Sequence, residues 1–501
     1  MIDVREGLRR AAAWNSDRVA IMQGDIKLTF AEAWDRGLRF ANALLDLGLK
    51  PGDCVAALEE NSLEAADFYL GTAAANIIRV PLYKKNSLQA HAHMVRHTRC
   101  KALVVSESLA HEVSGIGDLA PALKHVIVRD AGYESWLLSK SSSDPNPPIN
   151  LDDCYTIRHS GGTTGVPKGM AFTHRMWMNI ERDWTYRLPP IEIGDACLHV
   201  APISHASGYL FLPTWMSGGY NIFQNKFDAS VVLDLLSKHG GYCFVVPTIL
   251  GDLVAEAGDT QRSFARIKAI AVAGAPIRPQ TALAARALFG DCLHQLYGQT
   301  EAVPLTWMTP REWFDDTPGS QSLLSVGRVM PFAGVEIRDE NNGPLPAGEV
   351  GEVAVHCDGQ IAGFWNDSDL SKKRIVDGWV LTGDMGRLDR NGYLYLVDRK
   401  DDMIISGGQN IWPAELEIAI SSLAGVREVA VVGAPHPRWG ETPVAIVVPN
   451  DDADLDEGQI IAVCVEHLGS LKKPSKVIIQ RDLLPRTPVG KINRKYFRGR
   501  V

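Results

Sequence analysis

The sequence predicts an α/β protein with a large N-terminal domain, built from two helix-flanked sheets plus a small β-barrel, and a smaller α+β C-terminal domain. From residue 18 to about 300, short apolar runs alternate with stretches of helical periodicity, which is typical of helices packed on parallel sheets. After residue 320, short strands and tight turns follow one another, as in a small antiparallel barrel or sheet. The length of 501 residues also exceeds the roughly 250 to 300 residues that one core usually reaches.

The clearest predicted helix lies within residues 28–49. Thr29 and Glu32 have the spacing of a capping box, apolar residues follow at helical spacing, and Gly48 stands where a helix would end. Short apolar runs predict the strands, and their number implies more than one sheet: CKALVVS, HVIVRD, CLHVA, GYCFVVP, IKAIAVAG and CLHQLYG.

The last region, from about residue 402 to 501, is predicted to be a compact α+β unit. It contains a helix opened by Pro413, two strands, a second helix and a final strand, in the segments PAELEIAISSL, EVAVVGA, VAIVVP, GQIIAVCVEHLG and KVIIQ. Upstream, residues 139–150 form a polar, proline-rich connection before the strand that enters a glycine-rich loop.

Composition restricts the class of protein. Hydrophobic residues make up 46% and charged residues 22%, as in a soluble globular protein, and the net charge of -8 argues against nucleic acid as a partner. No apolar stretch approaches the roughly 18 residues of a transmembrane segment, and the N-terminus lacks the apolar core of a secretory signal. Eight scattered cysteines show no CxxC and no zinc spacing, so we expect reduced thiols and a cytoplasmic location.

Residues 160–169, SGGTTGVPKG, are the most informative segment. Four glycines allow the backbone to approach an anion closely, while threonine hydroxyls and Lys168 add donors and a positive charge. These features predict a polyphosphate-binding loop between two strands, although the order of proline, lysine and glycine differs from the Walker pattern. The alternative is a flexible glycine-rich surface loop without a ligand.

Further motifs follow this loop in a fixed order along the chain: APISH at 201–205, AGAP at 273–276, YGQTE at 297–301, LTGD at 381–384, DRKDDMIISGGQNIWPAELE at 398–417 and PRTPVGKINR at 485–494. With these motifs the chain resembles the adenylate-forming superfamily, which includes acyl-CoA synthetases, luciferases and the adenylation domains of peptide synthetases. The resemblance covers nearly the whole chain and is strongest to the acyl/aryl-CoA synthetase branch, the acid-CoA ligases.

The resemblance implies a reaction in two steps. A carboxylate attacks the α-phosphate of ATP and pyrophosphate leaves; a thiol, that of CoA, then attacks the acyl adenylate and AMP leaves. ATP, Mg²⁺ and CoA are therefore the expected cofactors and co-substrates. The resemblance also implies an N-terminal domain over residues 1–397, a hinge at 398–402 centred on Asp401, and a mobile C-terminal domain over residues 403–501.

The resemblance implies a nucleotide site in which the glycine-rich loop grips the β- and γ-phosphates. Thr300 would bond the α-phosphate, Tyr297 would form a wall of the adenine slot, and Asp384 with Arg399 would bind the ribose hydroxyls. The full implied set is Ser160, Gly161, Gly162, Thr163, Thr164, Gly165, Lys168, Gly274, Ala275, Pro276, Tyr297, Gly298, Thr300, Asp384 and Arg399.

Four residues are implied to act in catalysis. Lys491 resembles the lysine that bridges the attacking carboxylate and the α-phosphate, and Glu301 resembles the Mg²⁺ ligand. His205 and Thr300 complete the set. By itself Lys491 would be a solvated lysine in a basic tail, and Glu301 a solvated loop acid, but their motifs favour the functional roles.

The acyl pocket is implied to include His205, Ala206, Tyr209, Val272, Ala273, Val303 and Leu305. This set is mostly apolar with small members, which fits a ring or a medium-length chain better than a dicarboxylate needing a buried arginine. An aromatic or alicyclic acid is favoured narrowly over a fatty acid. Because no acidic residue follows ISHASGYLF, an amino acid substrate is disfavoured.

For CoA, the resemblance implies contacts from Gly407, Gly408, Trp439 and Lys473. Two alternatives stay open: an adenylating enzyme that loads a carrier-protein thiol, and a nucleotide- and acyl-binding protein without catalysis. The expected assembly is a monomer or a homodimer. The chain departs from the family pattern at Arg158, His159, Ile77, Ile78, Val272, Ala273 and Asp367, and these departures concern the substrate pocket rather than the reaction.

Overall fold

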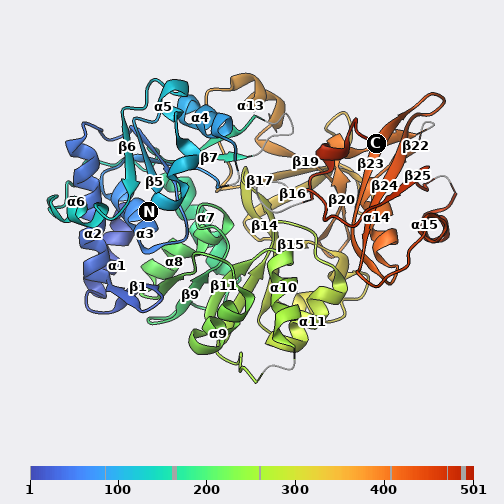
Figure 1. Cartoon of the computed structure of the whole chain (residues 1–501), viewed down its shortest axis with the longest axis horizontal. Coiled ribbons are helices and arrows are strands. Elements are labelled where there is room, and N and C mark those ends of the chain that lie inside the picture. Colours follow the sequence, from blue (N-terminus) through green and yellow to red (C-terminus); the bar gives the residue numbers. More distant parts are fainter. Residues whose placement is uncertain are drawn as a thin grey trace. The chain divides into compact units, whose positions relative to one another are not determined.

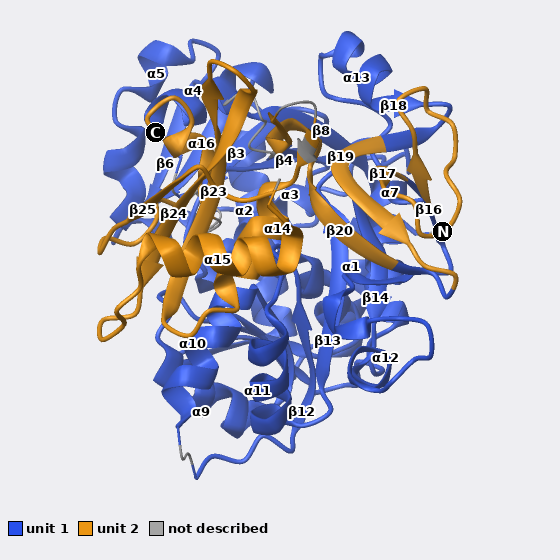
Figure 2. Ribbon diagram, turned by 90° about the vertical axis from the view of Figure 1, so that its right-hand side faces the viewer, with its two compact units in different colours: residues 1–335, 355–380, 391–393 blue, residues 336–354, 381–390, 394–501 orange. Residues whose placement is uncertain are grey.

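The computed structural model of the chain describes residues 2–84, 86–160, 166–258, 261–406, 409–470, 472–486 and 492–501 (Figure 1). Two compact units are distinguished in Figure 2: unit 1 comprises residues 1–335, 355–380 and 391–393, and unit 2 comprises residues 336–354, 381–390 and 394–501. The mixed α/β architecture, with a large N-terminal domain and a smaller C-terminal one, confirms the predicted fold class. The domain boundaries at 397 and 403 stay a prediction.

One sheet of unit 1 comes from the first third of the chain, with strands β3 (Cys54–Leu58), β4 (Ile78–Pro81), β5 (Ala102–Ser106), β6 (His125–Arg129), β7 (Cys154–Ser160) and β8 (Lys168–Thr173). The strand order is β6–β5–β3–β4–β7–β8, and only β7 and β8 pair antiparallel. Both faces of this sheet are buried. Val55 and Ala57 face the core that includes helices α2 (Phe30–Asp46) and α3 (Leu63–Ala74), while Ala56 and Leu58 face α4 (Leu88–His97).

The other sheet of unit 1 contains β1 (Val19–Gln23), β2 (Ile26–Thr29), β9 (Ala196–His199), β10 (Tyr220–Phe223), β11 (Gly241–Val245), β12 (Ile267–Val272), β13 (Leu293–Gln299), β14 (Ala302–Met308) and β15 (Gly327–Val329). Its strand order is β15–β14–β13–β12–β11–β9–β10–β1–β2. From β13 through β1 every neighbouring pair is parallel. Parallel strands end at a common edge, which is where open α/β sheets bind ligands.

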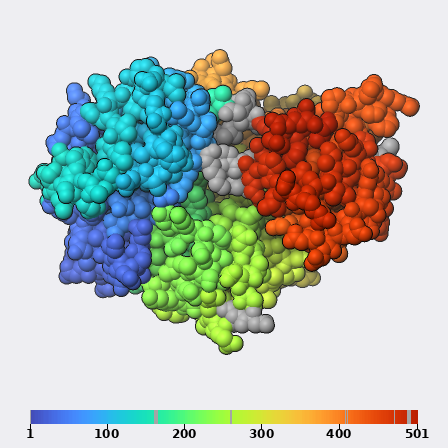
Figure 3. Space-filling model, viewed as in Figure 1, coloured from blue at the N-terminus to red at the C-terminus, as the bar shows by residue number. Residues whose placement is uncertain are grey.

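Further helices cover these strands or connect them: α1 (Val4–Trp14), α5 (Ile116–Leu119), α6 (Tyr133–Leu138), α7 (His174–Tyr186), α8 (Phe211–Met216), α9 (Ala229–His239), α10 (Pro247–Ala257), α11 (Pro279–Phe289), α12 (Pro310–Phe314) and α13 (Ser368–Arg374). Short 3-10 segments are η1 (Glu107–Val113), η2 (Ala206–Leu210) and η3 (Ser322–Leu324). The capping box predicted for α2 is confirmed, because the side chain of Thr29 accepts from the Glu32 amide and that of Glu32 accepts from the Thr29 amide. In the space-filling view, the blue and green segments of unit 1 meet without a gap (Figure 3).

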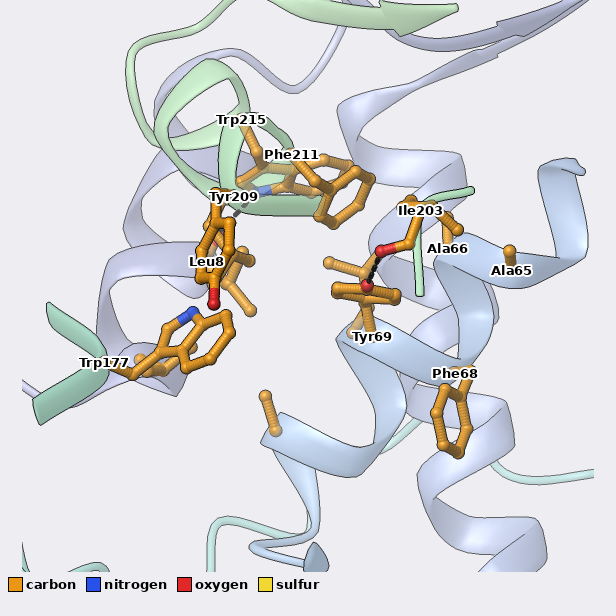
Figure 4. Close-up of a cluster of buried hydrophobic side chains, with 14 of the residues drawn as sticks. Leu8, Ala65, Ala66, Phe68, Tyr69, Trp177, Ile203, Tyr209, Phe211 and Trp215 are labelled. Atoms are coloured by element: carbon orange, nitrogen blue, oxygen red, sulfur yellow. Dashed lines mark hydrogen bonds between the residues drawn. The ribbon is translucent and has the colours of Figure 1, made fainter. Parts of the chain in front are cut away.

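An aromatic core fills unit 1 around α7 and α8 (Figure 4). The ring of Tyr209 lies between two indoles, with its centroid 5.4 Å from that of Trp177 and 5.0 Å from that of Trp184. Two hydrogen bonds fix neighbouring rings: Trp215 Nε1 donates to the Leu8 carbonyl at 3.1 Å, and the Tyr69 hydroxyl donates to the Ile203 carbonyl at 2.6 Å. Because the Tyr209 ring is closely packed between two indoles, it has a fixed orientation.

Unit 2 begins with parts of short strands that pair in the order β16 (Ala333–Arg338), β17 (Gly351–Cys357), β19 (Trp379–Leu388) and β20 (Tyr393–Arg399). The short strand β18 (Ile375–Val376), which pairs with β19, belongs to unit 1. The C-terminal region then forms β21 (Ile404–Ser406), β22 (Gln409–Ile411), β23 (Val426–His436), β24 (Gly440–Pro449) and β25 (Lys476–Ile479), with η4 (Lys400–Asp402), α14 (Pro413–Ser421), α15 (Glu457–Leu468) and α16 (Arg494–Phe497). Helices α14 and α15 pack on one face of this sheet. The predicted strand and helix segments of this region are confirmed.

All eight cysteines are free thiols, and seven of them are buried. Among the described residues, every helix is too short or too polar to cross a lipid bilayer.

A buried histidine makes the stability of unit 1 depend on pH. Substituting this one residue measures its contribution. His199 is fully buried on β9, with ring nitrogens 2.9 Å from Ser207 Oγ and 2.8 Å from Asn221 Oδ1. Burial lowers the pKa of this imidazole to about 4, whereas an unfolded histidine titrates near pH 6.5. Between those values the unfolded chain binds a proton that the folded chain does not, so wild-type stability falls as the pH falls, by about 3 kcal/mol in all.

We therefore expect His199→Gln to be less stable than the wild type at pH 7, with a deficit that shrinks as the pH falls from 6.5 to 4. Urea unfolding of both proteins at several pH values measures this difference. A deficit that is constant over this range would show that His199 does not stay neutral in the folded protein.

Candidate active site

The hairpin of β7 and β8 carries the glycine-rich loop. Residues 161–165, which include Thr163 and Thr164, lie outside the described residues, but the stem is defined: Ser160 pairs with Lys168, and His159 pairs with Gly169. Gly169 is closely surrounded, since a Cβ there would lie 3.1 Å from the His97 ring and 3.2 Å from Trp365 Cβ. The stem therefore holds Lys168 at the first position after the loop.

The predicted adenine and α-phosphate segments follow two neighbouring parallel strands. Gly274, Ala275 and Pro276 follow β12 after one residue, Ala273, and Gly274 adopts a φ of 92° that favours glycine. Tyr297 lies at the end of β13, and Thr300 with Glu301 forms the turn into β14. Because β12 and β13 pair in parallel, the structure brings both segments to one edge of the sheet.

Glu301 is partly buried, and its carbonyl accepts a hydrogen bond of 2.9 Å from the Ile361 amide, which anchors the turn. No group of three or more His, Cys, Asp or Glu side chains within the described ranges is placed to hold a metal ion. One carboxylate beside a threonine hydroxyl nevertheless suits Mg²⁺, which binds through one or two carboxylates together with substrate phosphates and waters.

The residues predicted to bind the ribose lie side by side in unit 2. Asp384 on β19 and Arg399 on β20 are register partners, and Arg399 Nε lies 2.9 Å from Asp384 Oδ1. Asp384 is only 8% exposed, and its amide donates to Thr382 Oγ1 at 3.1 Å. The ion pair orients the carboxylate, and a carboxylate is a suitable hydrogen-bond acceptor for a vicinal diol.

His205 is a neutral polar residue of the predicted acyl pocket. Its Nδ1 lies 3.2 Å from Ser204 Oγ, and its ring packs against Tyr83 with centroids 3.8 Å apart. Burial, with a smaller contribution from the charge of Arg158, lowers the pKa of His205 to about 3. His205 therefore carries no charge near neutral pH and can position a substrate without supplying a cation.

The other predicted pocket residues differ in burial. Val272, Val303, Leu305 and Tyr209 are buried, whereas Ala206 and Ala273 are partly exposed and pack against the aromatic core. Gly298 allows close packing, because a Cβ there would lie 2.5 Å from Val303 Cγ2. The alanines are thus the members with the most direct access to a ligand.

Arg158 is the residue that sequence reasoning missed, since it was noted only as a departure from the family pattern. Its guanidinium carbon lies 4.7 Å from the centroid of the Tyr209 ring, and its Nη2 donates to the Ser204 carbonyl at 3.2 Å. A cation is therefore buried among residues assigned to an apolar pocket. The available signal was a charged side chain inside the strand CYTIRHS, where both faces of the sheet are buried.

The residues assigned to CoA and the hinge lie in unit 2. Asp401 lies in η4, Trp439 is 44% exposed and stacks on His436 with ring centroids 4.3 Å apart, and Lys473 is exposed. Gly407, Gly408 and Lys491 lie outside the described residues. The roles of these residues stay predictions.

A buried ion cluster lies next to the predicted hinge. Arg494 on α16 bonds Asp398 Oδ1 at 2.7 Å, Asp402 Oδ2 at 3.2 Å and Glu417 Oε1 at 2.8 Å. Asp398 also accepts from the Ala414 amide at 2.7 Å, at the start of α14. The cluster therefore ties η4, α14 and α16 together.

Family models and known relatives match most of the chain. A family model described as AMP-binding enzyme matches residues 8–365, and one described as AMP-binding enzyme C-terminal domain matches residues 415–491. A feruloyl-CoA synthase of Amycolatopsis sp is 31% identical over 497 residues, covering 98% of this chain and 97% of the relative. The medium/long-chain-fatty-acid–CoA ligase FadD8 of Mycobacterium tuberculosis is 30% identical over 517 residues, covering 97% and 88%. The structure of ATP-bound MatB from Rhodopseudomonas palustris superposes with a TM-score of 0.89 at 28% identity, covering 100% and 99%.

Proposed function

The chain belongs to the AMP-binding enzyme family, and on that premise we propose that it is an ATP-dependent, AMP-forming carboxylic acid–CoA ligase. In the first step an oxygen of the acid attacks the α-phosphorus of ATP, the bond to the bridging oxygen breaks, and pyrophosphate leaves. In the second step the sulfur of CoA attacks the acyl carbon, AMP leaves with the bonding electrons, and the thiol proton passes to solvent.

The observation that carries this proposal is the common edge of β12 and β13, where Gly274–Pro276 and Tyr297–Glu301 meet. A flat base needs an aromatic wall and backbone polar groups, which Tyr297 and the Gly274 segment supply. Thr300 would donate to the α-phosphate beside it. Glu301 would hold Mg²⁺, which when bound neutralises charge on the phosphates.

The chemistry itself rests on fixed polar groups around a transferring phosphoryl centre. Lys168 and the donors of the glycine-rich loop would stabilise the departing pyrophosphate. Lys491 would neutralise the carboxylate and the α-phosphate as they approach, an interaction that is strongest in the transition state. The neutral imidazole of His205 would help to orient the acid without forming an ion pair with its carboxylate.

We propose an aromatic, alicyclic or medium-chain acid as the substrate. The stacked rings of Tyr209, Trp177 and Trp184 form a rigid apolar boundary near the pocket, and the two alanines leave space beside it. A carrier-protein thiol as acceptor is the alternative, because it would use the same adenylation site.

The proposed activity is tested by incubating the protein with ATP, Mg²⁺ and a panel of aryl, alicyclic, short-chain and medium-chain acids. We expect at least one acid to support pyrophosphate release, and CoA to convert the adenylate into a thioester with release of AMP. If the adenylate is converted into a thioester only with a pantetheinylated protein and not with CoA, the result favours the carrier-protein thiol as acceptor. If every acid fails to support pyrophosphate release, the protein is not an adenylating enzyme for these classes.

A further inference from the structure

Arg158 places a buried positive charge at the predicted acyl pocket. Its residue is only 5% exposed, and its guanidinium lies over the face of Tyr209, one of the rings stacked on Trp177 in Figure 4. Burial lowers the pKa of this guanidinium, but Tyr209, Tyr83 and Tyr69 together raise it, so the net pKa is above its usual value and the group stays charged.

This charge has no carboxylate partner within the described part of the chain. Arg158 makes no ion pair there: Nη2 bonds the Ser204 carbonyl, and Nε is buried without a hydrogen-bond partner. A buried guanidinium normally has a carboxylate or phosphate beside it, because desolvating an unpaired charge is costly. For comparison, the buried Arg129 is paired with Glu59.

The carboxyl group of Glu181, on α7, forms no hydrogen bond with Arg158. Burial raises the pKa of Glu181 well above its usual range, and the opposing influence of Arg79 and Arg158 is smaller. Both carboxyl oxygens are buried without a partner. Glu181 therefore forms no hydrogen-bonded ion pair with Arg158.

The position of Arg158 separates it from the phosphate-binding end of the hairpin. It pairs with Met170, two register positions away from the Ser160–Lys168 pair at the loop. Its neighbours are Ser204 and Tyr209, which belong to the predicted acyl side rather than to the nucleotide segments. The guanidinium is thus placed to meet the far end of an acid whose reacting carboxylate lies at the α-phosphate.

We propose that Arg158 is a specificity-determining residue: its guanidinium binds a second carboxylate of the substrate, remote from the carboxylate that is adenylated. The inference rests on the proposed acid–CoA ligase activity and narrows its substrate to ring or medium-length dicarboxylic acids. Nη2 is held by the Ser204 carbonyl, which fixes the plane of the guanidinium, and Nε remains to donate to the ligand.

The first test uses the wild-type enzyme alone. Ring and chain dicarboxylic acids are each compared with their monoamides, which are nearly isosteric but lack the second charge. We expect kcat/KM for adenylation to be about 100-fold or more higher for the diacid, because a site built to pair a polar group rejects an analogue that leaves it unpaired. Equal or faster adenylation of the monoamides overturns the proposal, whereas adenylation of no acid at all contradicts the ligase activity instead.

The second test assigns the preference to Arg158. Arg158→Met should abolish the difference between diacid and monoamide, and Arg158→Lys should restore part of it. A uniform loss for both acids would mean that Arg158 holds the reacting carboxylate or only supports the fold, and either result overturns the proposal. Even if Arg158→Met does not fold, the comparison of diacid and monoamide in the wild type shows whether the enzyme recognises a second carboxylate.

Arg79 offers a matched control in the same aromatic cluster. Its guanidinium is buried 3.7 Å from the centroid of the Tyr69 ring, and two of its nitrogens have no partner. Arg79→Met should lower the thermal midpoint without changing the ratio of diacid to monoamide. If the ratio changes in Arg79→Met but not in Arg158→Met, the second carboxylate binds to Arg79 instead of Arg158, and the proposal is overturned.

Discussion

Lys491→Ala is expected to slow adenylate formation by about 100- to 1000-fold and to leave the affinity for ATP nearly unchanged. The proposed ammonium group stabilises charge that accumulates as the carboxylate and the α-phosphate approach each other. An interaction that is stronger in the transition state than in the ground state changes the rate of the step rather than the binding of the substrate. Single-turnover pyrophosphate release measures the rate, and equilibrium binding of an ATP analogue measures the affinity.

Two controls make this result specific. Lys495→Ala removes an equally charged, exposed lysine from the same basic tail and should leave the rate within about twofold, since exposed surface charges contribute little. Thioester formation from a pre-formed acyl adenylate and CoA should also survive Lys491→Ala, because that half-reaction lacks the approach of two anions. An unchanged adenylation rate, or an equal effect of Lys495→Ala, would mean that Lys491 is only a solvated lysine.

Local patterns predicted the fold where neighbouring residues determine the structure. The capping box of Thr29 and Glu32 lies within one helical turn, so the sequence alone specifies the start of α2. Apolar runs predicted the buried parallel strands, because each run is also a local pattern. The division of the chain into domains was predicted from the resemblance. The structure adds that the segments after β12 and β13 lie at one edge of the sheet, because these two strands pair in parallel.

Sequence reasoning failed where a side chain meets partners from distant parts of the chain. Arg158 could be recognised as unusual in a buried strand, but its contact with Ser204, 46 residues away, depends on how the sheets pack. The same holds for Arg494, whose partner Asp398 lies 96 residues before it. The roles assigned to Lys491, Gly407 and the threonines of the glycine-rich loop rest on resemblance alone, because these residues lie outside the described ranges.

Arg494→Met is expected to destabilise unit 2 by about 3 to 5 kcal/mol, since breaking a buried ion cluster leaves uncompensated charge. Asp398 and Arg494 have side chains that are 4% and 19% exposed, so solvent screens their interaction weakly. Removing the guanidinium leaves Asp398, Asp402 and Glu417 close together without a cation. Hydrogen exchange of peptides from β23 and β24 reports the opening of this unit separately from unit 1.

The pH dependence distinguishes lost charge pairing from lost packing in Arg494→Met. Burial raises the pKa of Glu417, and Arg494 opposes that shift, so the variant should have a still higher Glu417 pKa in the folded state. A folded-state pKa above the unfolded value stabilises the variant relative to the wild type as the pH falls, and its deficit should therefore be smaller at pH 4.5 than at pH 7. Arg427→Met, which removes a half-exposed arginine 4.0 Å from Asp451, should cost less than about 1 kcal/mol at either pH. An equal deficit of Arg494→Met at both pH values would assign the loss to packing and not to the ion cluster.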